Sequence, residues 1–309
     1  GLADPGGTGN FSVPDILVRR IPQDRHKVKA ASLRLEAATA SDSGRNGFID
    51  RGETVSLTIA LRNYVENPLY ATKVRGIHST LYPEEARQYG GAHSVVRGDG
   101  DLVWAQAVAD CAAGRPRDIY EGGRVEGRSF YGGRWDLLPK DRYMWGSVQT
   151  VRGCPKHCSF CSVWRTDGQR PRTRDNNDII DEVRELRRHG FRFVLLADDN
   201  FYPVTLNDLA MAKRRADPAA LQNLETLRRE RFDLMERLAE LPEEMVFFTQ
   251  ITMEAAEDPA FLEAMHRAHI RGVLVGVESV TADGLKSVYK DFNLAGDALA
   301  QRLRVFREH

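Results

Sequence analysis

The sequence lacks any apolar run long enough to cross a bilayer, and neither sign of charge is in excess. Its most apolar stretches, 193–197 and 273–277, have the length of a β-strand. Lys plus Arg equals Asp plus Glu at 44 residues each, so no global positive field attracts nucleic acid. The segment from Gly1 to Pro5 has no basic end followed by an apolar core, as a signal peptide would. These absences predict a cytoplasmic protein that binds neither membrane nor nucleic acid.

Cysteine is also scarce, with four residues in the 309 of the chain. Three of them, Cys154, Cys158 and Cys161, lie close together, whereas a secreted disulfide framework would spread its cysteines between distant segments. The clustering therefore predicts a metal or cluster site in a reducing compartment. Cys111 stands apart, and we expect it to be a small buried residue or an idle thiol.

Composition divides the chain into three parts. Residues 1–75 are β-rich, with alternating apolar and polar residues in segments 32–37 and 54–61. Residues 76–145 are mixed and loop-rich, with a strand expected at 95–96 and a helix at 102–113. From 146 to 309, strands and helices alternate, which implies parallel strands joined by right-handed crossovers.

In this third part, strands are expected at 147–151, 193–197, 246–251 and 272–277, and helices at 178–189, 219–240, 259–269 and 296–308. Asn176 or Asn177 is the expected cap of the first helix. Four strand–helix units are fewer than the eight of a complete barrel. The predicted fold class is therefore α/β, with a partial and apparently truncated barrel.

The three cysteines follow a candidate strand at spacings of three and two intervening residues. A compact loop with this spacing can turn three thiolates toward one point. A 4Fe–4S cluster usually takes four cysteines, so three would leave one iron open to bind and activate a substrate. The alternatives are a zinc site with His157 as fourth ligand, although His157 and Cys158 are adjacent, and cysteines that bind nothing.

This segment, with an aromatic residue before the last cysteine, resembles the signature loop of the radical S-adenosylmethionine (SAM) superfamily. The resemblance implies a partial (β/α)6 barrel in which SAM chelates the open iron of a 4Fe–4S cluster. One electron from the cluster then cleaves SAM to methionine and a 5′-deoxyadenosyl radical, which abstracts a hydrogen atom. It also implies an external electron donor of the flavodoxin or ferredoxin type and a small-molecule or peptide substrate.

The same resemblance assigns cofactor contacts to residues in the cysteine loop or near the carboxyl ends of the predicted strands. Asp198, Asp199 and Asn200 follow the second strand and resemble an acidic variant of the motif that binds the SAM amino group. Gly276 and Glu278, at the end of the fourth strand, resemble the family's glycine-plus-glutamate strand end near adenine and ribose. The full set is Phe160, Asp198, Asp199, Asn200, Gln250, Thr252, Gly276 and Glu278. Capping, a turn or core packing is the alternative for each of them.

Residues 76–309 resemble the cobalamin-binding-domain subgroup of this superfamily, in which a Rossmann-like domain precedes the barrel and can hold cobalamin as a methyl carrier. Two departures are evident. No Asp-x-His-x-x-Gly sequence is present, and the first half of the Rossmann-like domain is not recognisable. We therefore expect residues 76–145 to be a Rossmann-like remnant, with methyl transfer implied only by the family.

Residues 1–75 resemble an extracellular β-sandwich module with a calcium-type loop. Asp42, Asn46, Asp50 and Glu53 occupy ligand positions of the twelve-residue calcium pattern, whereas Gly44 replaces a further oxygen ligand. The flanking segments are predicted to be strands rather than the helices of an EF-hand. The alternative to calcium binding is an ordinary turn formed by Gly, Asn and Asp residues.

Three hypotheses for function follow. The first is a radical SAM enzyme of transferase or rearrangement type. The second is an iron–sulfur or SAM-binding protein without turnover, because the barrel is incomplete. The third is a non-enzymatic module that binds zinc.

Overall fold

The computed structural model describes residues 77–88, 92, 94–138 and 143–309, together with the backbone of five strands before residue 77. The chain divides into two compact units, Gly1–Thr72 and Lys73–His309. The boundaries expected at residues 75 and 145 remain predictions.

The described strands of the first unit form one antiparallel sheet. They are β1 (Leu2–Ala3), β2 (Asn10–Ser12), β3 (Leu33–Asp42) and β4 (Val55–Asn63), in that order across the sheet. The strands predicted at 32–37 and 54–61 are thus confirmed, although β3 runs further. Asp42 ends β3, whereas Asn46, Asp50 and Glu53 lie outside the described residues. Calcium binding therefore stays a prediction.

The second unit begins with a three-stranded parallel sheet. Its strands are β5 (Lys73–Val74), β6 (Ser94–Gly98) and β7 (Ile119–Gly123), in chain order. Helices α1 (Ile77–Leu81) and α2 (Pro83–Gln88) connect the first pair, and α3 (Trp104–Ala112) connects the second. Parallel strands joined by helical crossovers also occur in Rossmann-like sheets. The assignment of residues 76–145 as a Rossmann-like remnant stays a prediction.

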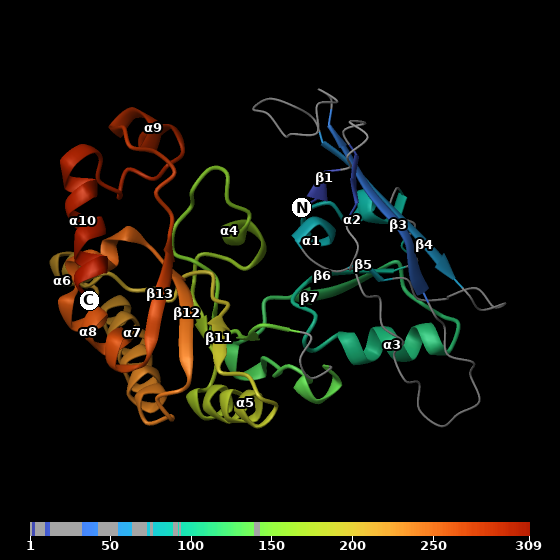
Figure 1. The fold of residues 1–309 in the computed structure, drawn as a ribbon, viewed down its shortest axis with the longest axis horizontal. Helices are drawn as coiled ribbons and strands as arrows, with labels where there is room; N and C mark the ends of the chain where they lie inside the picture. Colours follow the sequence, from blue (N-terminus) through green and yellow to red (C-terminus); the bar gives the residue numbers. More distant parts are fainter. Residues whose placement is uncertain are drawn as a thin grey trace. The chain divides into compact units, whose positions relative to one another are not determined.

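A second parallel sheet follows. Its strands are β8 (Gly146–Val148), β11 (Phe193–Leu196), β12 (Val246–Ile251) and β13 (Ile270–Val275), again adjacent in chain order (Figure 1). The crossovers contain α5 (Asn176–Arg188), α6 (Leu206–Arg214), α7 (Pro218–Ala239) and α8 (Pro259–Arg267). The predicted alternation of strands and helices is confirmed, and with it the α/β class.

The remaining elements are short, except for the last helix. They are the 3-10 turns η1 (Gly127–Ser129), η2 (Trp135–Leu137) and η3 (Met253–Glu257), the strands β9 (Val151–Arg152) and β10 (Arg172–Thr173), and the helices α4 (Val163–Thr166), α9 (Ala282–Ser287) and α10 (Gly296–Glu308). Strands β9 and β10 pair antiparallel, which brings together the two ends of the segment between them.

The main core lies between the second parallel sheet and the helices α5, α7 and α8, which cover one of its sides (Figure 1). Fully buried residues such as Leu186, Leu238 and Phe261 supply the helical half of this core. Burying a side chain of this size contributes about 1.5–3 kcal/mol. The packing therefore fixes the sheet, and the carboxyl ends of its four parallel strands share one edge.

The cap predicted for α5 is wrong by one or two residues. Asp175 is the cap, because its backbone is extended and its side chain accepts a hydrogen bond from the amide of Asn177 at 2.8 Å. Asn176 lies inside the helix, where its Nδ2 atom donates instead to Asp233 of α7 at 2.8 Å. Asn176 therefore joins α5 to α7 instead of capping the start of α5.

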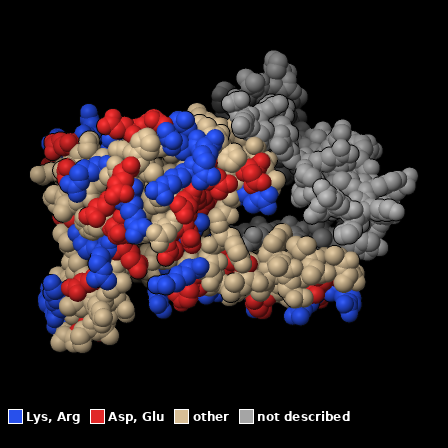
Figure 2. Space-filling view, turned by 90° about the horizontal axis from the view of Figure 1, so that it is seen from below, with Lys and Arg blue, Asp and Glu red and all other residues tan. Residues whose placement is uncertain are grey.

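Among the described residues, no helix combines the length and apolarity needed to span a bilayer. Figure 2 shows acidic and basic side chains interspersed over the face in view, without a large region of one sign. This distribution agrees with the equal totals of acidic and basic residues in the sequence.

Candidate functional site

The three clustered cysteines lie on one loop, residues 153–161, which we call the cysteine loop. It leaves β9 at Gly153, whose φ of +94° favours glycine. A β-carbon at Gly153 would also lie 3.0 Å from the carbonyl oxygens of Gly168 and Arg170. The amide of Cys154 donates to the carbonyl oxygen of Gly168 at 3.1 Å. This backbone hydrogen bond holds the start of the cysteine loop against the segment that follows α4.

The thiols of the cysteine loop are free and mostly shielded from water. Cys158 is buried, and Cys154 and Cys161 are partly buried. Burial raises the pKa of the Cys154 thiol to about 11, against the opposing effect of the backbone N–H of Lys156. Burial also raises the pKa of Cys158, whereas the charge of Lys290 lowers it. A metal held by these thiols would therefore have to displace their protons.

Asp199, just after β11, connects that strand to the cysteine loop. Its Oδ2 atom accepts a hydrogen bond of 2.6 Å from the amide of Gly153. Burial raises the pKa of Asp199 to about 6, and the hydrogen bond from Gly153 works in the opposite direction. The carboxylate thus holds the first residue of the loop at the carboxyl edge of the sheet.

Its neighbour Asp198 lies in a different environment. Asp198 is fully buried, and its carboxylate accepts hydrogen bonds from the hydroxyl of Thr150 and from the amides of Thr150 at 2.5 Å and Val151 at 2.8 Å. The guanidinium of Arg231 lies 3.9 Å from the same carboxylate. Burial raises the pKa of Asp198, and the charge of Arg231 opposes this effect. Asp198 therefore holds the turn between β8 and β9.

Two other predicted residues carry buried polar atoms without a hydrogen-bond partner in the described part of the chain. These atoms are Nδ2 of Asn200 and Oγ1 of Thr252. The other amide atom of Asn200, Oδ1, accepts from the amide of Tyr202 at 3.1 Å. Gln250, by contrast, donates its side-chain amide to the carbonyl of Asp198. Thr252 follows β12 directly and Asn200 lies four residues after the end of β11, and a bound polar ligand would satisfy both unpartnered atoms.

The end of β13 forms a compact polar group. Glu278, with a φ of +54°, forms an ion pair with Lys290, whose side chain is only 8% exposed. Asn293 donates its Nδ2 atom to the carbonyl of Gly276 at 3.0 Å, and its buried Oδ1 atom has no partner among the residues described. A β-carbon at Gly276 would lie 2.5 Å from Nζ of Lys290, so a larger residue here would displace the Lys290 side chain from its ion pair.

Lys290 is the residue of this group that sequence analysis missed. It lies twelve residues beyond Glu278, and the loop around it has no periodicity that marks one lysine among several. The structure places its ammonium close enough to Cys158 to lower the pKa of that thiol. Lys290 therefore belongs to the same site as the cysteines.

Two aromatic residues of the cysteine loop region point away from the interior. Phe160 is 58% exposed, so none of the described residues covers its ring fully. The ring of His157 stacks on Tyr289, with 6.0 Å between ring centroids and 29° between planes. Within the described residues, no three His, Cys, Asp or Glu side chains converge on a position for one metal ion. The zinc hypothesis, which used His157 as a ligand, is therefore not favoured.

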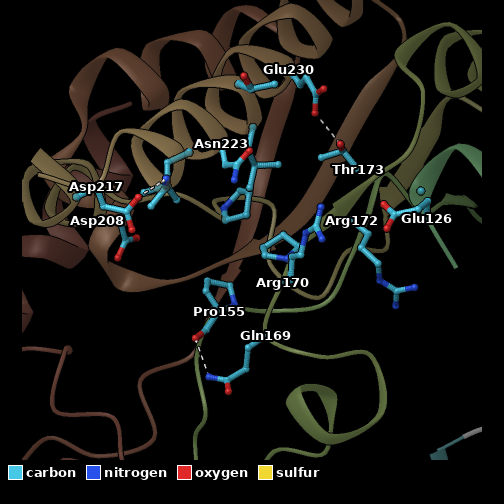
Figure 3. A pocket seen from close by; sticks show the side chains of 18 of the residues that line it. Glu126, Pro155, Gln169, Arg170, Arg172, Thr173, Asp208, Asp217, Asn223 and Glu230 are labelled. Carbon is cyan, nitrogen blue, oxygen red and sulfur yellow. Dashed lines mark hydrogen bonds between the residues drawn. The ribbon is translucent and has the colours of Figure 1, made fainter. Parts of the chain in front are cut away.

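A cavity of about 790 Å³ adjoins the cysteine loop. Pro155 and Gln169 form one wall, and Met211, Leu224 and Leu227 of α6 and α7 supply apolar surface. Figure 3 shows Asp208 and Asp217 at one end, Glu126 and Arg172 at the other, and Arg170 between them. This volume is within the range of small-molecule sites.

These residues fit a 4Fe–4S cluster and SAM. Three thiols on one loop are soft donors of the type that iron–sulfur clusters take. In a four-iron cluster each thiolate binds a different iron, so the thiols need not meet at one point. Asn200, Thr252 and Asn293 each have one buried polar atom without a partner among the described residues, and a bound polar ligand would satisfy these atoms.

Comparison with known proteins agrees with this geometry. The Radical SAM superfamily profile matches residues 148–308. The chain is 29% identical to the hopanoid C-2 methylase of Rhodopseudomonas palustris (strain TIE-1) over 165 residues, which are 52% of this chain and 27% of that protein. It is 26% identical to an uncharacterized methyltransferase of Synechocystis sp. over 70% of this chain and 37% of that protein.

A similar fold occurs in a solved structure of the radical SAM methyltransferase TsrM from Kitasatospora setae, with its tryptophan substrate and a SAM analogue bound. The TM-score is 0.53 at 18% identity, and the match covers 75% of this chain and 47% of that one. The chain thus spans less than half the length of these relatives. Because the superfamily profile covers more than half of the chain, the chain belongs to the radical SAM superfamily, whose members use a 4Fe–4S cluster and SAM.

Proposed function

We propose that this chain binds a 4Fe–4S cluster through Cys154, Cys158 and Cys161 and cleaves SAM reductively to methionine and a 5′-deoxyadenosyl radical. The radical takes a hydrogen atom from a small molecule, which is then methylated. Because the cleaved SAM keeps its methyl group on methionine, a second SAM supplies the transferred methyl group through a methyl carrier. The observation that carries this proposal is the set of three free thiols on one loop, tied to the carboxyl edge of a parallel sheet through Asp199. The names of the hopanoid methylase and of the Synechocystis methyltransferase favour methyl transfer over other radical reactions.

The bound cluster supplies the electron that cleaves SAM. The residues at the strand ends hold SAM against it. Asn200 and Thr252 contribute their unpartnered polar atoms, and Glu278 contributes its partly exposed carboxylate. Asp198 acts by holding the β8–β9 turn in place, since its own carboxylate is fully buried. Phe160 contributes its exposed ring as a stacking surface for adenine.

The substrate occupies the cavity beside Pro155. Gln169 donates a hydrogen bond to the carbonyl of Pro155 at 3.3 Å, which joins the cavity wall to the residue next to Cys154. The apolar surface of Met211 and Leu224 suits the body of a small organic molecule, and Arg170 and Asn223 offer polar contacts between the two ends of the cavity. A peptide is the runner-up substrate, and an external flavodoxin-type or ferredoxin-type protein supplies the electron.

Cobalamin is the candidate methyl carrier. A second TsrM structure was solved with cobalamin and a [4Fe-4S] cluster bound, at a TM-score of 0.50. The parallel sheet β5–β7 supplies the Rossmann-like strands on which a cobalamin rests, but the sequence has no Asp-x-His-x-x-Gly segment to give a histidine to the cobalt. Visible absorption of the desalted protein after incubation with hydroxocobalamin tests this part of the proposal.

Cluster binding is tested by anaerobic reconstitution with iron and sulfide. We expect about four irons per chain and an axial electron paramagnetic resonance signal after reduction. The Cys158→Ala variant loses both, whereas Cys111→Ala, which changes the isolated buried thiol, keeps them. Zinc at one equivalent with no iron bound would refute the cluster.

A further inference from the structure

Lys156 lies in the cysteine loop between the first two cysteines, yet its side chain turns inward. A lysine in a loop usually keeps its ammonium in water. Here the side chain is only 16% exposed, and Nζ lies 2.9 Å and 2.8 Å from the two carboxylate oxygens of Glu254, which is 11% exposed. The ammonium also lies 4.5 Å from the centroid of the Phe292 ring. Both contacts strengthen when water is excluded.

The two partners of Lys156 are themselves held by the fold. Glu254 belongs to η3, which follows β12, and Phe292 lies between α9 and α10. Arg302 of α10 donates to the carbonyl of Phe292 at 3.5 Å and forms an ion pair with Glu257 of η3. The inward position of Lys156 is therefore fixed by residues far away in sequence, with Glu254 98 positions and Phe292 136 positions beyond it.

Two further contacts join the cysteine loop to the same region. The amide of Ser159 donates to the carbonyl of Val288 at 3.1 Å, and His157 stacks on Tyr289. The side-chain contacts of Lys156 are the ones that carry charge. If the cysteine loop moved away, the carboxylate of Glu254 would keep a poorly solvated charge without its partner. That cost holds the loop in the arrangement in which Lys156 and Glu254 are paired.

We propose that Lys156 is a positioning residue, which fixes the cysteine loop through Glu254 and Phe292 and so retains the cluster. The retention of the cluster rests on the function proposed above. The fixing of the loop does not.

The first experiment uses the cluster-free chain and measures hydrogen exchange at the Ser159 amide. Lys156→Met keeps the length of the side chain and removes its charge. We expect exchange at Ser159 to become about tenfold faster or more, while the core amide of Phe247, bonded to His269, stays unchanged. Arg187→Met, which breaks the exposed pair with Glu244, serves as the control and leaves Ser159 unchanged.

Unchanged exchange at Ser159 in Lys156→Met would overturn the proposal. So would equal acceleration at Ser159 and Phe247, because the ion pair would then stabilise the fold as a whole rather than the loop. Lys156→Arg keeps the charge and is expected to restore most of the protection at Ser159.

The second experiment uses the reconstituted chain and measures the rate of iron loss to a chelator. We expect loss about fivefold faster or more in Lys156→Met and in Glu254→Gln, with the double variant no faster than either single one, because both act through one contact. Wild-type rates in both variants would refute the role in cluster retention. If no variant or wild-type chain takes up a cluster, the proposed function fails, and the exchange experiment still decides whether Lys156 fixes the loop.

Discussion

The amide of Gly153 donates a 2.6 Å hydrogen bond to Oδ2 of Asp199, and this contact joins the start of the cysteine loop to the end of β11. The two residues lie 46 positions apart in sequence. Parallel packing of β8 and β11 brings them together, because both strands end at the same edge of the sheet. The position of the cysteines therefore depends on the sheet as well as on their own spacing.

Asp199 is expected to give the cluster-free chain a pH-dependent stability. Its folded pKa of about 6 lies above the ordinary value of 3.8, so the folded state holds this proton more tightly than the unfolded state. The free energy of unfolding therefore falls as pH rises from about 4 to about 6, by on the order of 2 kcal/mol. Asp199→Asn removes this fall and keeps an oxygen that accepts from Gly153.

Urea unfolding across that pH range measures the effect. Asp283→Asn, at an exposed position in the first turn of α9, is the control and keeps the wild-type pH dependence. An Asp199→Asn variant whose stability falls with pH as steeply as that of the wild type would contradict the assignment.

Gly153→Ala is expected to destabilise the chain more than Gly190→Ala does. Both glycines have similar positive φ angles, +94° and +96°, so alanine at either is strained by about 1 kcal/mol. Only at Gly153 does the added methyl meet two carbonyl oxygens, at 3.0 Å. We expect a loss of about 2–3 kcal/mol there in urea unfolding, together with weaker iron retention. Equal losses would show that the base of the cysteine loop adjusts freely.

Arg231→Met is expected to cost about 3 kcal/mol of stability, because it leaves the fully buried Asp198 without its only nearby cation among the described residues. The opposing pKa shifts agree with this. Burial lowers the pKa of Arg231 and raises that of Asp198, and the charge of each residue opposes the effect of burial on the other. Arg184→Met breaks an exposed pair with Asp181 and is expected to cost less than about 0.5 kcal/mol. Similar losses in thermal or urea unfolding for the two variants would refute this account.

Regular elements with strong periodicity could be predicted from the sequence. The strand Val246–Ile251 and the helix Gly296–Glu308 have the predicted ends. Helix α6 was missed, although Thr205 and Asp208 form a capping box that marks its start. Helix α6 itself carries few large apolar residues, so its sequence shows no helical periodicity that would predict it.

The site was only partly predictable, because burial depends on contacts between distant residues. Asp198 and Asp199 are equivalent in sequence, and only packing against Thr150 and Arg231 distinguishes the buried one from the one beside the cysteine loop. The inward position of Lys156 likewise depends on Glu254, 98 residues away. No local pattern indicates either arrangement.

The production of 5′-deoxyadenosine tests the central claim most directly. The reconstituted chain is incubated anaerobically with SAM and dithionite, beside Cys158→Ala as the variant that lacks a cluster ligand and Cys111→Ala as the control. We predict that the wild type and Cys111→Ala form 5′-deoxyadenosine and that Cys158→Ala forms none. A wild-type chain that holds its four-iron cluster, binds SAM and still yields no more 5′-deoxyadenosine than Cys158→Ala would contradict the account.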